Sequence, residues 1–122
     1  MTRDCPATPV PFSQGTAAPR TTLPAGACDC HVHVYDASAS DYRALQQRLG
    51  TERTVLVTPS TYGADNRCML QGLAALGEQA RGVAVIDGRE SDAQLQALHD
   101  AGVRGARLNL SLGVTGSVDA IL

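Results

Sequence analysis

The sequence predicts an α/β fold in which four parallel β-strands alternate with three α-helices. Three observations lead to this prediction. Short apolar runs rich in β-branched residues recur between residues 27 and 110, each as long as a buried strand. The segments between them carry leucine and methionine at helical spacing. Glycine, proline and capping residues separate the two kinds of segment, so the connections are short.

The four predicted strands are short and end at turn residues. Val32 and Val34 mark the first strand, and the second is the run Thr-Val-Leu-Val-Thr, which Pro59 stops. The predicted strands cover residues 27–35, 54–58, 82–87 and 103–110.

The first two predicted helices begin at capping residues. Ser40 is positioned to cap a helix that runs to about residue 49, where Gly50 ends it. Asp65 or Asn66 can cap the second helix. The apolar residues of that helix recur at helical spacing and are Met69, Leu70, Leu73 and Leu76.

The third predicted helix follows a capping box. Ser91 is followed three residues later by Gln94, the spacing at which the two ends of this motif cap each other. Leu95 and Leu98 form the apolar side of the helix, and Gly102 closes it before the fourth strand.

The resulting order β-α-β-α-β-α-β favours a parallel sheet with right-handed crossovers. Four strands and three helices are the N-terminal half of a TIM-type (β/α)8 barrel, which needs about 250 residues to close. We therefore expect residues 27–122 to form a partial barrel domain and the chain to be a fragment or truncated gene product, the alternative being a small open α/β sheet. Residues 1–26, rich in Pro, Thr and Ala, are expected to form an N-terminal arm. Self-association through the two open sheet edges is a further expectation.

Composition excludes several functional classes. The net charge of −2 argues against a nucleic-acid partner, and no apolar run is long enough to span a membrane. All ten basic residues are arginine, a pattern typical of a GC-rich bacterial coding sequence. Residues 1–26 contain no apolar signal-peptide core, and Cys28 and Cys30 lie too close along one strand to bridge easily. We therefore expect a cytoplasmic protein with reduced thiols.

The strongest functional signal is the His-x-His pair of the first strand. Because side chains alternate along a strand, Asp29, His31 and His33 are predicted to share one face. The two imidazoles can converge on one divalent metal, zinc above all, or on one substrate oxygen. Two alternatives remain open: a half-buried histidine pair without a ligand, and a metal site that also uses Cys28 and Cys30. Strand alternation opposes the second alternative.

On the fourth strand, Arg107 and Asn109 are predicted to share the face opposite Ala106, Leu108 and Leu110. An inward arginine is costly unless an anion meets it, so we expect Arg107 to bind a substrate carboxylate. The alternative is a structural ion pair with Asp29 or Asp87.

Four stretches of the sequence together resemble a known family. They are residues 24–36 (Pro-Ala-Gly-Ala-Cys-Asp-Cys-His-Val-His-Val-Tyr-Asp), residues 41–45, residues 57–66 and residues 102–109. In this order they resemble the amidohydrolase-related family of the amidohydrolase superfamily. The branch they are most similar to contains the lactone hydrolases of the 2-pyrone-4,6-dicarboxylate hydrolase type.

The resemblance implies a distorted (β/α)8 barrel that hydrolyses a small, carboxylated lactone or a related ester or amide. It places His31 and His33 at the barrel mouth, as metal ligands or as groups that stabilise an oxyanion. It makes Ser60 and Tyr62 substrate contacts, whereas a turn that only caps the next helix is the alternative. The resemblance implies a divalent metal as the cofactor, most simply zinc, because members of this branch are similar in motif to zinc enzymes. It also implies metal-independent catalysis as the alternative, since some members of the branch are thought to work without a metal.

The resemblance also expects a later histidine and a late aspartate that acts as general base. The only other histidine, His99, lies on the third predicted helix, facing solvent or the outer side of the sheet. Two hypotheses follow: a hydrolase whose truncated chain lacks part of its machinery, and a non-catalytic remnant or small metal-binding module that keeps the histidine pair.

Overall fold

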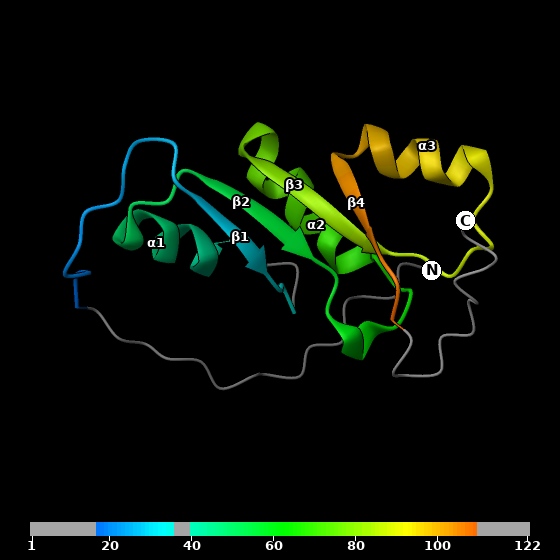
Figure 1. The fold of residues 1–122 in the computed structure, drawn as a ribbon, viewed down its shortest axis with the longest axis horizontal. Coiled ribbons are helices and arrows are strands. Elements are labelled where there is room, and N and C mark those ends of the chain that lie inside the picture. The colour runs from blue at the N-terminus through cyan, green and yellow to red at the C-terminus, as the bar shows by residue number, and fades with distance from the viewer. Residues whose placement is uncertain (1–16, 36–39, 110–122) are drawn as a thin grey trace.

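The computed structural model of the chain describes residues 17–35 and 40–109. Four parallel strands form one sheet in the order β1-β2-β3-β4. The strands are β1 (Cys28–Val32), β2 (Arg53–Val57), β3 (Ala80–Val85) and β4 (Val103–Arg107). Their arrowheads in Figure 1 all point to the same end of the sheet.

Three α-helices and two short 3-10 turns connect the strands. The helices are α1 (Ser40–Leu49), α2 (Arg67–Leu76) and α3 (Asp92–Asp100), and the turns are η1 (Ser60–Tyr62) and η2 (Gly77–Gln79). The predicted alternation of strands and helices is confirmed, with strand ends displaced by a few residues. The first strand ends at Val32 rather than at residue 35, and the third begins at Ala80, two residues before its predicted start.

The sheet order identifies the kind of α/β fold. Every pair of neighbouring strands is consecutive in the chain, so the order never reverses as it does in a doubly wound sheet. Right-handed crossovers then place all the connecting helices on one face, as in the wall of a barrel. The described residues therefore form four strands of a TIM-type (β/α)8 barrel, as predicted.

The core lies between the sheet and α2. Leu56 and Met69 are fully buried there, and Gly82 of β3 lets α2 approach closely. A Cβ atom at Gly82 would lie 2.7 Å from the Met69 sulfur and 2.8 Å from a Leu73 methyl group. The absence of a side chain at Gly82 thus sets the distance between α2 and the sheet.

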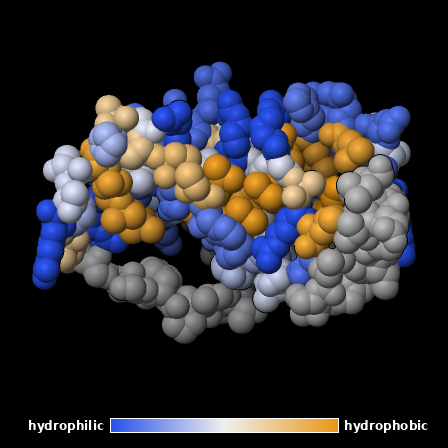
Figure 2. All heavy atoms as spheres, in the orientation of Figure 1, coloured by the Kyte–Doolittle hydropathy of each residue, from blue (hydrophilic) through white to orange (hydrophobic). Residues whose placement is uncertain are grey.

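Helix α3 packs more loosely than α2. The predicted capping box of Ser91 and Gln94 is confirmed, yet α3 has no buried residue and Leu95 is 43% exposed. Figure 2 shows hydrophobic residues, in orange, reaching the surface in the region of α3. The cap, and not burial, therefore specifies where this helix starts.

Strand β1 contains an irregularity that the alternation of its sequence does not reveal. Asp29 pairs with Thr54, but the next pair is Val32 with Leu56, so β1 advances three residues while β2 advances two. One extra residue is a β-bulge, and it reverses the alternation of faces. The prediction that Asp29 shares a face with His31 and His33 is therefore wrong.

The cysteines differ in state. Cys28 and Cys30 are free thiols, as expected, whereas Cys68 of α2 is disulfide-bonded, so the expectation of reduced thiols is wrong for Cys68.

Within residues 17–35 and 40–109, no helix combines the length and apolarity needed to cross a membrane.

Candidate active site

All six candidate residues lie at the carboxyl end of the sheet, the end to which the arrowheads point in Figure 1. The first strand supplies His31, with His33 directly after its end. Strand β4 ends at Arg107, and Asn109 follows two residues later, 6% exposed. The turn η1, which carries Ser60 and Tyr62, follows β2. In barrel enzymes this end of the strands carries the chemistry.

The imidazole of His33 is held by the end of β2. Its Nδ1 atom lies 2.7 Å from the backbone oxygen of Val57, so Nδ1 carries the proton and Nε2 keeps its lone pair in the neutral ring. The ring of His31 lies edge-on to that of His33, with 4.9 Å between their centres. His33 is half-buried and His31 is exposed. The pair thus presents one oriented and one more accessible imidazole.

An aromatic row continues from the histidine pair to the loop after β2. The ring centre of Tyr35 lies 6.3 Å from that of His33 and 5.9 Å from that of Tyr62. The Tyr62 hydroxyl donates to the backbone oxygen of Tyr35, which joins η1 to the end of β1. Tyr35 is not among the site residues predicted from the sequence, although its spacing of two residues from His33 was a usable signal.

Arg107 reaches from β4 to the end of β2. Its Nη1 atom donates to the backbone oxygen of Thr58, over 3.3 Å. His33 and Arg107 thus bind consecutive carbonyl groups, those of Val57 and Thr58. Side chains at the ends of the two outer strands, β1 and β4, therefore meet at the last residue of β2 and the residue that follows it.

The one ion pair whose two partners both lie within the described residues joins Arg67 to Asp65, on the surface. Arg107 therefore pairs with neither Asp29 nor Asp87, and the alternative of a structural ion pair is not supported. The positive charge of Arg107 therefore lies at the carboxyl end of the sheet without a carboxylate of the described residues beside it, and it favours the binding of an anion there.

Asn66 fixes the loop that carries η1. Its Oδ1 atom accepts from the Thr58 hydroxyl at 2.7 Å and from the Val85 backbone N–H at 2.9 Å. Its Nδ2 atom donates to the Val85 backbone oxygen at 2.9 Å. Asn66 is the N-cap residue of α2 by position but its side chain forms no cap hydrogen bond, so of the two predicted capping residues Asn66 is not the one that caps through its side chain. Asp65 accepts from the Arg67 backbone N–H instead.

The histidine pair by itself falls short of what a metal requires. Residues 17–35 and 40–109 contain no group of three or more His, Cys, Asp or Glu side chains that could hold an ion. Catalytic zinc normally takes three protein ligands, and His31 and His33 supply two. The described residues therefore do not complete a metal site, and neither Cys28 nor Cys30 joins the histidines in one.

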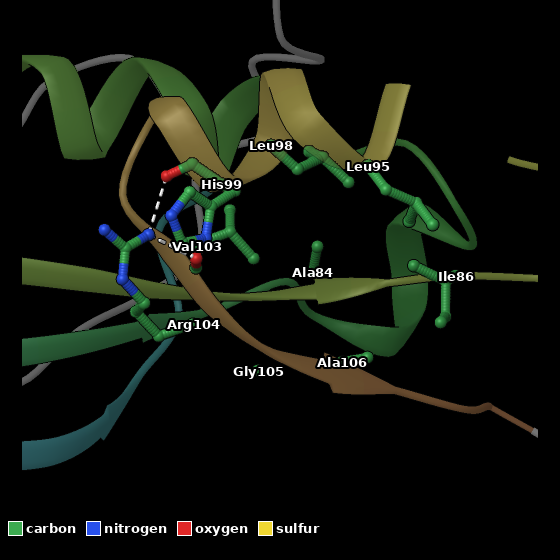
Figure 3. A pocket seen from close by; sticks show the side chains of 9 residues that line it. All are labelled: Ala84, Ile86, Leu95, Leu98, His99, Val103, Arg104, Gly105 and Ala106. Carbon is green, nitrogen blue, oxygen red and sulfur yellow. Dashed lines mark hydrogen bonds between the residues drawn. The ribbon is translucent and has the colours of Figure 1, made fainter. Parts of the chain in front are cut away.

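A separate groove of about 320 Å³ lies on the outer side of the sheet, between α3 and β4 (Figure 3). Arg104 lies at one end of it, where its Nη1 atom donates to the backbone oxygens of His99 and Val103. Apolar residues such as Leu95 and Leu98 line the rest. His99 thus lies away from the carboxyl ends of the strands, as predicted, and so does Arg104.

The parallel strand order and the histidine pair at the carboxyl end of the sheet are features that the sequence resemblance implies, and comparison with known proteins identifies the family. The family model described as Amidohydrolase matches residues 4–120. The chain belongs to this family.

Three curated relatives are similar to the chain. It is 44% identical to a 2-pyrone-4,6-dicarboxylate hydrolase of Comamonas testosteroni over 75% of the chain and 35% of that relative. It is 30% identical to a D-galactarolactone isomerase of Agrobacterium fabrum, over 75% and 37%. It is 30% identical to a 4-sulfomuconolactone hydrolase of Rhizobium radiobacter, over 70% and 34%. The chain thus spans about a third of the length of the curated relatives it matches.

Solved structures show the same fold. A protein of Agrobacterium tumefaciens matches with a TM-score of 0.67 and 30% identity, over 74% of the chain and 39% of its own. A protein of Pseudomonas putida matches at 0.65 and 36%, over 72% and 38%. A probable 2-pyrone-4,6-dicarboxylic acid hydrolase of Acinetobacter baumannii, with citric acid bound, matches at 0.65 and 26%, over 70% and 38%.

Proposed function

We propose that this chain is the first half of an amidohydrolase-type barrel that hydrolyses a small, carboxylated lactone. The observation that carries the proposal is the meeting of His33 and Arg107 at the consecutive carbonyl groups of Val57 and Thr58. The carboxyl end of the sheet thus offers imidazoles for a reacting carbonyl group and a guanidinium for a carboxylate.

Each candidate residue has a role in this reaction. The imidazoles of His31 and His33 polarise the lactone carbonyl group and stabilise the oxyanion that forms when water attacks the carbonyl carbon. The ring C–O bond then breaks, and the leaving oxygen takes up a proton. Arg107 binds a carboxylate of the substrate through its two-pronged guanidinium group.

Three further side chains orient the ring. Ser60 and Tyr62 act through their hydroxyl groups, and Asn109 acts through its amide. A general base that activates water is required as well, and the described residues offer no carboxylate in that position. We propose that the remaining part of a complete barrel supplies it.

The proposal is tested with a 2-pyrone dicarboxylate, the substrate class named in one relative. The chain is assayed alone and mixed with a polypeptide that spans the rest of the Comamonas relative's barrel. Formation of the ring-opened acid, followed by mass spectrometry, is expected from an active combination. His31→Ala should abolish it, while His99→Ala, on the outer side of the sheet, should not.

Other outcomes separate the rival functions. An isomerised lactone with an intact ring would indicate isomerisation, the reaction in the name of the Agrobacterium relative. No turnover in either preparation, with stoichiometric zinc that is lost in His33→Ala, would favour a small metal-binding module. If neither preparation turns over the lactone and neither binds zinc, the result would favour a non-catalytic remnant.

We also propose that the isolated chain associates with itself through the open edges at β1 and β4. An open parallel sheet presents unpaired N–H and C=O groups at both edges.

A further inference from the structure

A hydrogen-bonded cluster behind the histidine pair links α1 to the start of β1 and β2. The Tyr42 hydroxyl of α1 lies 2.8 Å from the Thr54 hydroxyl and 3.3 Å from Asp29 Oδ2. Thr54 is buried at 2% exposure, and Tyr42 and Asp29 are half-buried. A buried hydroxyl needs a partner, and Tyr42 is the partner that Thr54 has here.

The direction of these hydrogen bonds follows from the number of protons. A phenol has one proton, and a threonine hydroxyl both donates and accepts. The arrangement that satisfies all three groups has Thr54 donating to Tyr42 and Tyr42 donating to the Asp29 carboxylate. Burial raises the pKa of Tyr42 to about 12, against a lowering by the Thr54 hydrogen bond, so the phenol keeps its proton at neutral pH.

The same carboxylate lies at the bulge of β1. Asp29 is the last regularly paired residue before the extra residue, and Val32 is the next. Asp29 Oδ1 accepts from the His31 backbone N–H at 3.4 Å, so its two oxygens bind α1 on one side and the bulge on the other. His33 follows the bulge, and its imidazole is hydrogen-bonded through Nδ1 to the Val57 carbonyl group.

We propose that Tyr42 is a positioning residue for the histidine pair. Its hydroxyl, held by Thr54, fixes the Asp29 carboxylate on the helix-facing side of β1 and thereby fixes the bulge from which His31 and His33 project. The importance of the pair rests on the proposed function, but the geometric claim does not.

Tyr42→Phe in the full chain tests this inference without any substrate. The readout is the ratio of the two neutral tautomers of His33, measured from imidazole nitrogen NMR shifts. In the parent chain the Nδ1–H form should dominate. In Tyr42→Phe we expect that ratio to fall roughly fivefold, the factor that corresponds to one typical hydrogen bond. The signals of His99 serve as an internal reference because His99 lies on α3.

Arg43→Gln is the matched control. Arg43 neighbours Tyr42 on α1, and its guanidinium donates to the Ala75 backbone oxygen of α2, so its loss loosens α1 without touching Asp29. This variant should leave the His33 ratio unchanged. An unchanged ratio in Tyr42→Phe, or an equal change in both variants, would overturn the inference.

Asp29→Asn is the second variant, for the case in which Tyr42→Phe does not fold. It keeps the shape of the side chain, weakens acceptance from Tyr42 and should lower the same ratio. If the ratio stays at the parent value, the inference is wrong. Because no lactone is used, a lack of turnover in the mixture of this chain with the rest of a barrel would contradict the proposed function and leave this test intact.

Discussion

The guanidinium of Arg107 shows how a single residue connects sequence, fold and chemistry. It projects from the last position of β4 and donates to the carbonyl group of Thr58, the residue directly after β2, without a carboxylate partner among the described residues. A single hydrogen bond to a neutral carbonyl leaves the other donors of the guanidinium free to bind an anion. The proposed carboxylate of the substrate fits this position.

Replacing Arg107 should weaken the binding of a carboxylated lactone selectively. In Arg107→Gln we expect the Kd for a pyrone dicarboxylate to rise roughly 10- to 100-fold, because a charge-assisted hydrogen bond contributes about 1.5–3 kcal/mol. Titration calorimetry measures the effect, with Arg104→Gln as the control from the helix-facing side. If Arg107→Gln weakens the binding of a lactone without carboxylates by the same factor, Arg107 does not recognise the carboxylate.

The raised pKa of Tyr42 predicts a pH dependence of stability. Its pKa of about 12 in the folded chain lies above the ordinary value of 10, so the folded state holds the phenol proton more tightly than the unfolded state. The resulting stabilisation is fully present below pH 10 and is lost as the pH rises towards 12. Urea unfolding between pH 9 and 12 should therefore show a steeper loss of stability in the parent chain than in Tyr42→Phe. Parallel curves would contradict this account.

At the scale of elements, the loop after β2 is fastened to β3 rather than left as a turn. The Asn66 amide binds both backbone groups of Val85 and the Thr58 hydroxyl, and so pins η1 against the next strand. Nothing in the period of the sequence distinguishes this from an ordinary N-cap. A cap and a clamp use the same residue types, and only the position of β3 decides between them.

Asn66→Ala should therefore destabilise the fold well beyond the loss of a helix cap. We expect the free energy of unfolding to fall by about 1–3 kcal/mol, because the Val85 N–H group loses its side-chain partner. Asp65→Asn is the neighbouring control, since its exposed ion pair with Arg67 is worth no more than about 1 kcal/mol. Urea denaturation of both variants measures the difference, and similar losses would exclude a clamp.

At the scale of the whole molecule, the sheet formed by the described residues 17–35 and 40–109 is open at β1 and β4, and α3 has no buried residue. A barrel has no edges, whereas half of one has two, and a second chain can pair with them. The histidine pair lies at the β1 edge, and Arg107 lies at the β4 edge.

The purified chain is accordingly expected to form dimers or larger species at micromolar concentration. Sedimentation velocity over a range of concentrations measures this, with Leu95→Glu as a variant that charges the exposed surface of α3 while leaving the strand edges unchanged. If the strand edges mediate association, this variant should associate like the parent. A monodisperse monomer with one sharp unfolding transition would refute the expectation.

The sequence by itself determined the order of strands and helices, the capping box of α3 and the strands and turns that carry the six candidate residues. These features depend on local patterns, because apolar periodicity and capping geometry involve residues close along the chain. Only the tertiary structure decided the face of Asp29, the role of Asn66 and the contacts of His33 and Arg107 with β2. Each of these depends on the register between strands, where one inserted residue reverses a face without changing the sequence pattern.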